Sequence, residues 1–223
     1  MRLLVTGGAG FIGSNFVHYV LKNHPDWSIV NLDKLTYAGN IDNLATVMDH
    51  PRHTFVKGDI LDHELVHRLV KNVDVIVHFA AESHVDRSIE HAEVFLKTNI
   101  LGTFVLLEAA RRFNVRFHHV STDEVFGSLG EEGFFTESSP YDPRSPYSAS
   151  KAASDHLVRS YANTYKLPIT ISNCGNNFGP FQFPEKIIPL FVTNLIQNKK
   201  VPLYGEGKNE RDWIFVEDHC RAI

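Results

Sequence analysis

Residues 6–13 read Thr6-Gly7-Gly8-Ala9-Gly10-Phe11-Ile12-Gly13, a glycine-rich segment near the N-terminus. It follows an apolar run, Leu3–Thr6, and precedes an amphipathic run, so it joins a predicted strand to a predicted helix. In this context glycine lets the backbone turn tightly and approach a pyrophosphate, whose negative charge the helix N-terminus favours. The stretch predicts a dinucleotide-binding loop, with a Gly-rich turn that binds nothing as the alternative.

Two overlapping glycine patterns fit this loop. Gly8, Gly10 and Gly13 form the literal GxGxxG, whereas Gly7, Gly10 and Gly13 form the looser GxxGxxG. The loop residues expected to touch the cofactor are Gly7, Gly10, Phe11, Ile12 and Gly13.

Outside the loop, short β-branched runs alternate with longer amphipathic stretches, a pattern typical of βαβ units. Strands are predicted over Leu3–Thr6, Ile29–Leu32, Thr54–Lys57, Val73–Phe79, Arg116–Ser121 and Ile169–Asn173. Helices are predicted over Gly10–His24, Asp62–Lys71, Glu93–Phe113 and Pro146–Tyr165. The expected fold is α/β, a doubly wound, right-handed parallel sheet of the Rossmann type.

The amino-acid composition changes after Cys174, where Gly, Asn and Pro become frequent. We therefore predict a cofactor domain over residues 1–173 and the start of a smaller substrate domain over 174–223. A helix at Ile187–Asn198 and strand-like runs at Val201–Tyr204 and Arg211–Val216 are expected there. Residues 217–223 look like the first turns of a helix without a closing cap, which predicts a longer chain or a fragment.

Composition excludes several classes of protein. The 223 residues are 43% hydrophobic and 22% charged, as in an ordinary globular protein. The net charge of -4 gives no basic footprint for nucleic acid. The sequence contains no apolar run of membrane-spanning length and no cleavable leader, and its two cysteines are too few for a disulfide framework. A cytoplasmic protein with reduced thiols is expected.

Asp33 ends the second predicted strand, 20 residues after Gly13. A carboxylate there binds the adenosine ribose diol and repels a 2′-phosphate, so it favours NAD over NADP. A turn aspartate is the alternative, and the neighbouring Lys34 would soften the discrimination. Further cofactor contacts are expected at the strand ends, from Lys34, Leu35, Thr36, Asp59, Ile60, Phe79, Ala80, Ala81, Glu82 and Ser83.

Thr122, Asp123 and Glu124 follow the fifth predicted strand, at the sheet edge where ligands bind in open parallel sheets. Two adjacent carboxyl groups repel, so the pKa of one rises and the pair offers an acid and a base. The alternative is a solvated loop. Tyr147 and Lys151 lie four residues apart on one helix face. The ammonium is expected to lower the pKa of the phenol, which then accepts a hydroxyl proton.

Together these residues resemble the extended short-chain dehydrogenase/reductases, and among them the dTDP-glucose 4,6-dehydratases. The matching stretches run from the first strand to the end of the chain. They include residues 32–40 (LDKLTYAGN), 80–88 (AAESHVDRS), 117–125 (FHHVSTDEV), 145–151 (SPYSASK), 176–186 (NNFGPFQFPEK) and 211–213 (RDW). The Thr-Asp-Glu triplet is the specific part, because related epimerases and decarboxylases lack the acid pair.

The resemblance implies that one bound sugar is oxidised, dehydrated and reduced. Tyr147 deprotonates the C4 hydroxyl, which Thr122 orients, while hydride passes to NAD. Glu124 then removes the C5 proton and Asp123 protonates the leaving C6 hydroxyl. Hydride returns to C6 and a proton returns to C5, which leaves a 4-keto-6-deoxy nucleotide sugar and regenerates NAD.

The resemblance also implies binding residues and an assembly. Thr98 and Asn177 lie on the cofactor side. The substrate dTDP-glucose contacts Ser83, Thr122, Asn176, Lys186, Ile187, Pro202, Leu203, Tyr204 and Arg211. Of these residues, only Lys186 and Arg211 are also supported by their chemistry, because their cationic side chains suit the phosphate groups of the substrate. The helices over Glu93–Phe113 and Pro146–Tyr165, with apolar positions Phe95, Leu106, Leu107 and Leu157, imply a homodimer, although their spacing fits a monomer core equally well.

The sequence departs from the family at three aromatic positions. Phe126, Phe178 and Phe181 replace tyrosines, so each keeps its ring and loses a hydroxyl. Family members also continue beyond Ile223, which puts substrate affinity in question more than cofactor binding.

Three other functions remain open. A sugar-nucleotide epimerase or decarboxylase has the same fold, and a non-catalytic NAD-binding module would need only the cofactor loop. His63-Glu64-Leu65-Val66-His67 is a literal HExxH zinc motif. It occupies the place of a crossover helix and offers no third ligand, so we predict no metal.

Overall fold

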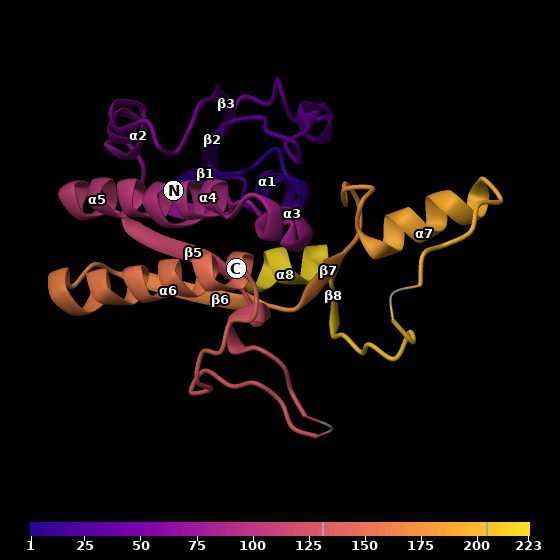
Figure 1. Cartoon of the computed structure of the whole chain (residues 1–223). Helices are drawn as coiled ribbons and strands as arrows, with labels where there is room; N and C mark the ends of the chain where they lie inside the picture. The colour runs from indigo at the N-terminus through magenta and orange to yellow at the C-terminus, as the bar shows by residue number, and fades with distance from the viewer. Residues whose placement is uncertain (131, 204) are drawn as a thin grey trace.

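The computed structural model describes residues 1–130, 132–203 and 205–223. Six parallel strands form the central sheet: β1 (Arg2–Thr6), β2 (Ser28–Asp33), β3 (His53–Lys57), β4 (Val75–His78), β5 (Arg116–Thr122) and β6 (Ile169–Cys174). Their order is β3-β2-β1-β4-β5-β6, which reverses between β1 and β4 (Figure 1). The predicted doubly wound Rossmann-type sheet is confirmed, with each strand within two residues of its predicted bounds.

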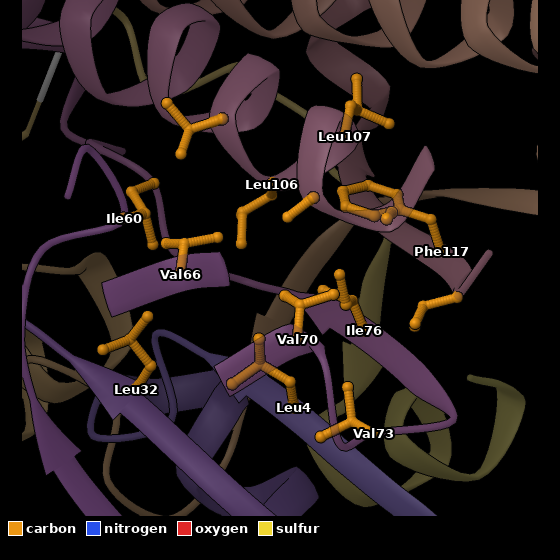
Figure 2. Close-up of a cluster of buried hydrophobic side chains, with 14 of the residues drawn as sticks. Leu4, Leu32, Ile60, Val66, Val70, Val73, Ile76, Leu106, Leu107 and Phe117 are labelled. Atoms are coloured by element: carbon orange, nitrogen blue, oxygen red, sulfur yellow. The ribbon is translucent and has the colours of Figure 1, made fainter. Parts of the chain in front are cut away.

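Helices cover both faces of this sheet. On one side lie α2 (His63–Val70), α5 (Thr103–Phe113) and α6 (Pro146–Tyr165); on the other lie α1 (Phe11–Asn23) and α8 (Val216–Ala222). Because successive strand residues point to opposite faces, Leu4 joins one buried cluster (Figure 2) while Leu3 and Val5 join the other.

The predicted helix over Glu93–Phe113 is interrupted. The structure has α4 (Ala92–Phe95), a π-helical segment η2 (Leu96–Gly102) and then α5. Within η2 the Asn99 side chain bonds both the N–H and the C=O of Glu82, at 2.9 and 3.0 Å, and the Thr103 hydroxyl donates to the Asn99 carbonyl at 2.6 Å. The Thr103 hydroxyl thus bonds a carbonyl of the helix itself, a local contact that hydrophobic periodicity does not reveal.

After Cys174 the chain forms a second parallel pair of strands, β7 (Asn176–Phe178) and β8 (Trp213–Phe215), and helix α7 (Ile187–Ile196). Residues 201–203 are not in a strand, so that part of the predicted strand is wrong, and Tyr204 lies outside the described residues. Helix α7 projects from the body (Figure 1), whereas Val216 and Cys220 of α8 belong to the buried cluster of α1. The boundary at residue 173 stays a prediction.

The remaining elements are short. They are α3 (Val85–Glu90) and the 3-10 turns η1 (Ile41–Leu44) and η3 (Asp123–Phe126), none of which the sequence pattern predicted. Among the helices that the structure describes, none combines the length and the apolar character needed to cross a membrane.

Candidate active site

A cavity of about 480 Å³ lies at the carboxyl ends of the parallel strands. The strand ends, the glycine loop and the segment after β6 all contribute to its lining. The five predicted catalytic residues all line it: Thr122, Asp123, Glu124, Tyr147 and Lys151. The loops that follow β1, β2, β4, β5 and β6 thus meet at one edge of the sheet, as parallel strands require.

The glycine loop forms one wall of the cavity. Gly7 has a φ of +75°, and a Cβ there would come within 2.6 Å of the Ala80 backbone nitrogen. Gly7, Gly10 and Gly13 line the cavity, whereas Gly8 packs against the Asn31 side chain of β2. The looser GxxGxxG pattern is therefore the one that faces the cavity.

The first turn of α1 suits an anion. Its N-cap residue is Gly10, so the helix begins without the side-chain cap that Asp62 gives α2 and Ser145 gives α6. The first turn of α1 contains no acidic residue. Backbone N–H groups at such an end, together with the helix dipole, favour a pyrophosphate.

Asp33 is held at the end of β2 by two backbone amides. Its carboxylate oxygens accept from Ala9 N at 2.9 Å and from Leu35 N at 2.8 Å. Burial raises the pKa of Asp33, although both hydrogen bonds favour its ionised form. The Lys34 ammonium instead forms an ion pair with Asp59, at 2.6 Å, so it does not neutralise the charge of Asp33. These contacts suit recognition of an uncharged ribose diol.

The acid pair lies where β5 ends. The Thr122 hydroxyl donates to Asp123 Oδ1 at 3.2 Å and accepts from the Glu124 amide at 3.2 Å, which turns the chain into η3. Burial raises the pKa of both carboxyl groups, and the charge of Asp123 raises that of Glu124 further. Hydrogen bonds from Thr122 and the backbone favour the ionised form of Asp123. The two carboxyl groups predicted to act as acid and base therefore lie side by side, and two causes raise the pKa of Glu124.

Helix α6 presents Tyr147 and Lys151 to the same cavity. Pro146 at its first position and a capping box between Ser145 and Ser148 fix where it begins. Lys151 is 4% exposed and its ammonium donates to the Val120 carbonyl at 2.9 Å. Burial and the charge of Glu124 raise the pKa of Tyr147, and burial lowers that of Lys151. Desolvation of the phenolate therefore dominates in the protein without NAD⁺, and the lowering of the phenol pKa by Lys151 together with the nicotinamide ring of NAD⁺ stays a prediction.

The structure places most of the other predicted site residues at the cavity. On the cofactor side these are Phe11, Ile12, Lys34, Thr36, Asp59, Ile60, Phe79, Ala80, Ala81, Glu82, Ser83, Thr98 and Asn177, and on the substrate side Asn176, Lys186 and Ile187. Leu35, Pro202, Leu203 and Arg211 lie outside the lining, and Tyr204 is outside the described residues. The charge of Arg211 nevertheless lowers the pKa of Glu124.

Sequence reasoning missed several lining residues, among them Tyr37, Cys174, Phe183 and Glu185. The Tyr37 hydroxyl lies 3.5 Å from Ser83 Oγ, and the Arg87 guanidinium lies 4.0 Å from the centre of its ring. Tyr37 stands in the matched run after Asp33, and Cys174 ends β6, so the strand-end rule that located the acid pair would also have located these two residues.

The HExxH motif lies on crossover helix α2, with His63 and Glu64 exposed and His67 half-buried. Leu65, Val66 and Val70 are buried, while the His67 ring packs edge-on against Phe113 at 5.9 Å. Among the described residues there is no cluster of three metal-ligating side chains.

The three phenylalanines that replace tyrosines all pack against other rings. Phe126 lies 5.1 Å from Phe135 and 5.2 Å from Tyr141, centre to centre. Phe178 and Phe181 have Phe215 and His18 as neighbours, each at 5.5 Å.

Comparison with known proteins agrees with this geometry. The family model described as GDP-mannose 4,6 dehydratase matches residues 4–223. A dTDP-glucose 4,6-dehydratase of Neisseria gonorrhoeae is 54% identical over all of this chain and 68% of its own length, and one of Mycobacterium tuberculosis is 56% identical over 67% of its length. DesIV, a dTDP-glucose 4,6-dehydratase from Streptomyces venezuelae solved with NAD and TYD bound, superposes with a TM-score of 0.96 at 57% identity, covering 99% of this chain and 70% of that one. The chain thus spans about two thirds of the length of these relatives.

Proposed function

Because this chain belongs to the GDP-mannose 4,6-dehydratase family, we propose that it dehydrates dTDP-glucose to the 4-keto-6-deoxy sugar with NAD as cofactor. It is then a lyase of nucleotide-sugar metabolism that makes deoxysugar precursors. One observation carries the proposal: Asp123 and Glu124 open into the same cavity as Tyr147 and Lys151. A plain dehydrogenase needs only the second pair, and the acid pair supplies what an elimination requires.

Each residue then has a step. NAD held against Gly7, Gly10 and Gly13 would supply the hydride acceptor for C4 and the hydride donor for C6. Tyr147 removes the C4 hydroxyl proton, and Thr122, whose hydroxyl lies between the two pairs, orients that hydroxyl. Glu124 removes the C5 proton that the new ketone has acidified. Asp123 gives its proton to the departing C6 hydroxyl, so water leaves, and a proton goes back to C5 when C6 receives hydride.

The cavity offers binding groups for NAD and for the sugar nucleotide. The uncapped first turn of α1 would take the pyrophosphate of NAD and Asp33 the adenosine ribose. Lys186, which also lines the cavity, would approach the diphosphate of the sugar nucleotide.

The Asp33 contacts predict cofactor choice. Asp33→Asn keeps the shape and loses the charge, so NAD should bind about tenfold more weakly, the range of a hydrogen bond to a charged group. NADP should bind more tightly than it does to the native chain, because less charge repels its 2′-phosphate. Calorimetric titration with both cofactors checks this, with the exposed Asp26→Asn as control; an unchanged ratio of the two affinities would refute the assignment.

The proposed reaction itself is tested by incubating the chain with NAD and dTDP-glucose. The 4-keto sugar is followed by its absorbance in alkali and identified by mass, with Glu124→Gln as control. An epimerase would give a product of unchanged mass, and a decarboxylase would leave dTDP-glucose untouched. Bound NAD with no product at all would support a cofactor-binding module.

A cytoplasmic homodimer is the assembly we propose. Phe95, Leu106 and Leu107 are core residues of the monomer, so they do not support a dimer. Leu101 and Phe104 on η2 and α5 are 52% and 38% exposed and offer an apolar face. Light scattering at micromolar concentration should give twice the chain mass, and Leu101→Glu should give the monomer. A monomeric native chain would remove this proposal.

A further inference from the structure

A third buried carboxylate lies behind the Tyr147–Lys151 pair. Asp155 is 0% exposed and stands one helical turn after Lys151 on α6, so both side chains share a helix face. The reaction proposed above does not use it. A carboxylate removed from water is costly unless it is hydrogen-bonded and its charge is balanced, so its partners indicate its role.

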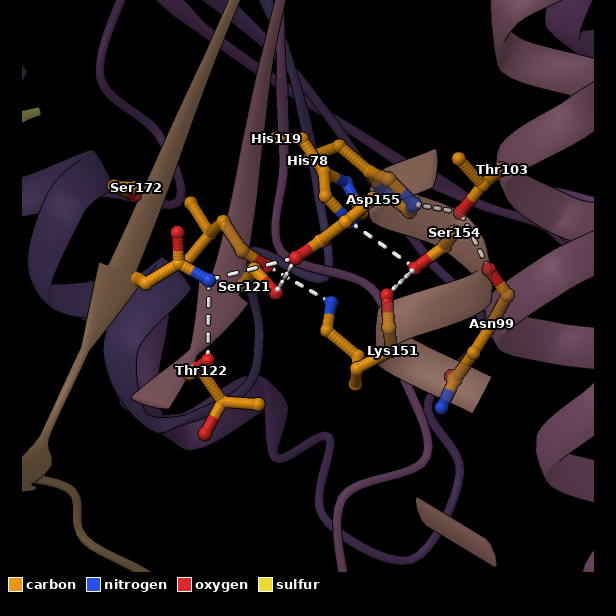
Figure 3. Close-up of polar contacts among 12 residues, drawn as sticks. His78, Asn99, Thr103, His119, Ser121, Thr122, Lys151, Ser154, Asp155 and Ser172 are labelled. Carbon is orange, nitrogen blue, oxygen red and sulfur yellow. Dashed lines mark hydrogen bonds and ion pairs between the residues drawn. The ribbon is translucent and has the colours of Figure 1, made fainter. Parts of the chain in front are cut away.

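Its hydrogen bonds tie α6 to the sheet. Asp155 Oδ2 accepts from Ser121 Oγ at 2.8 Å (Figure 3). It also accepts from Tyr141 OH at 2.8 Å and from Asn173 Nδ2 at 3.4 Å. Ser121 precedes Thr122 at the end of β5, and Asn173 also donates to the Thr122 carbonyl at 3.1 Å. The helix that presents the phenol is therefore fixed to the strand ends that present the acid pair.

A neutral histidine completes the shell of Asp155. His119 Nε2 lies 3.2 Å from Asp155 Oδ1 and 3.2 Å from Ser154 Oγ. Because the Ser154 hydroxyl donates to the Lys151 carbonyl at 2.8 Å, its oxygen must accept from His119, which places the imidazole proton on Nε2. Burial holds the pKa of His119 at about 4, so the ring carries no charge at neutral pH.

The cation that balances Asp155 must then be sought elsewhere. The titratable groups facing Lys151 come from four elements: His78 of β4, His119 of β5, Cys174 of β6, and Tyr147 and Asp155 of α6. Both histidines have a lowered pKa, and burial raises that of Cys174 to about 11 and that of Tyr147 above its ordinary value, so these four are neutral at pH 7. Asp155, whose pKa is lowered, is the anion among these groups, and its charge favours the ammonium of Lys151 from one helical turn away.

We propose that Asp155 is the positioning residue of Lys151: it supplies the counter-charge of the buried ammonium and locks α6 to the ends of β5 and β6. What Lys151 does for a sugar substrate rests on the proposed function; the pairing of the two charges does not. Without Asp155 the ammonium would be an unbalanced buried charge, which proteins relieve by releasing the proton.

The titration of Lys151 tests the pairing directly. Protein labelled with 13C at the lysine Cε is titrated by NMR, and the Lys151 signal is identified by its loss in Lys151→Met. In Asp155→Asn the Lys151 titration should move to lower pH by about one unit or more, because an anion has been removed. Ser121→Ala, which removes a hydrogen bond and keeps the charge, and the exposed Asp142→Asn should leave it in place. An unmoved titration in Asp155→Asn would overturn the proposal.

Thermal unfolding keeps the test decisive if Asp155→Asn folds poorly. The double variant Asp155→Asn/Lys151→Met no longer buries a lone ammonium, so it should melt at a higher temperature than Asp155→Asn alone. A double variant that melts lower, or that also fails to fold, would show that Asp155 has only a structural role. Neither measurement needs a substrate, so a chain that makes no 4-keto sugar would refute the proposed function and leave the pairing standing.

Discussion

Replacing Tyr147 by phenylalanine is expected to lower the formation of 4-keto sugar from dTDP-glucose by about 10³-fold, within the range of general acid–base catalysis. The ring is 9% exposed and lies 6.3 Å from Phe95, so the variant keeps its packing and loses only the hydroxyl. The first step, oxidation at C4, then has no proton acceptor. Unlike a variant of the acid pair, Tyr147→Phe should therefore show no reduced nicotinamide at any time.

The direction of the pH dependence of the oxidation step can also be predicted. Burial raises the pKa of Tyr147, so the phenolate fraction grows as pH rises through the neutral range. The oxidation step of the native chain should accelerate with rising pH, and Tyr147→Phe should lose that dependence. Stopped-flow absorbance of the nicotinamide measures it. Tyr165→Phe is the matched control, the same change on the same helix at an exposed position. Turnover of Tyr147→Phe within about threefold of native would contradict the assignment.

The sequence predicted the site better than it predicted the helices around it. Thr122, Asp123 and Glu124 could be placed because a parallel sheet sends the ends of all its strands to one edge, and strand β5 was visible as an apolar run. Tyr147 could be joined to them because Ser145 and Pro146 mark where α6 begins. Both arguments need only local sequence and one rule of topology.

What the sequence could not predict depends on contacts between distant segments. Asn99 lies in the segment that interrupts the helix and bonds Glu82, and the choice of Gly7 over Gly8 depends on Asn31 of the next strand. Asp155 reads as an ordinary polar residue of an amphipathic helix until Ser121 and Tyr141 are seen to surround its carboxylate. Pro202 and Leu203 were assigned by resemblance alone, and the chain leaves them exposed and away from the cavity.

The acid pair carries the second large prediction. Glu124→Gln should lower product formation by about 10³-fold, as loss of a general base does. Oxidation at C4 remains possible because Tyr147 and Lys151 are untouched, so dTDP-glucose should now produce reduced nicotinamide that persists. The exposed Glu137→Gln is the matched control and should behave as the native chain.

Isotope exchange separates the roles of the two carboxyl groups. If Glu124 is the base, Glu124→Gln should incorporate no deuterium from heavy water at C5, whereas Asp123→Asn should still exchange C5 while failing to release water from C6. Burial and the charge of Asp123 both raise the pKa of Glu124. A raised pKa makes its carboxylate a stronger base, and it also makes its carboxyl group keep a proton more readily, as an acid must. Exchange that survives in Glu124→Gln and disappears in Asp123→Asn would therefore reverse the two roles. The pH dependence of turnover tests the same assignment. A base with a raised pKa loses its activity as pH falls through that pKa. The fall of turnover at low pH should therefore lie above the range of an ordinary glutamate and should vanish in Glu124→Gln.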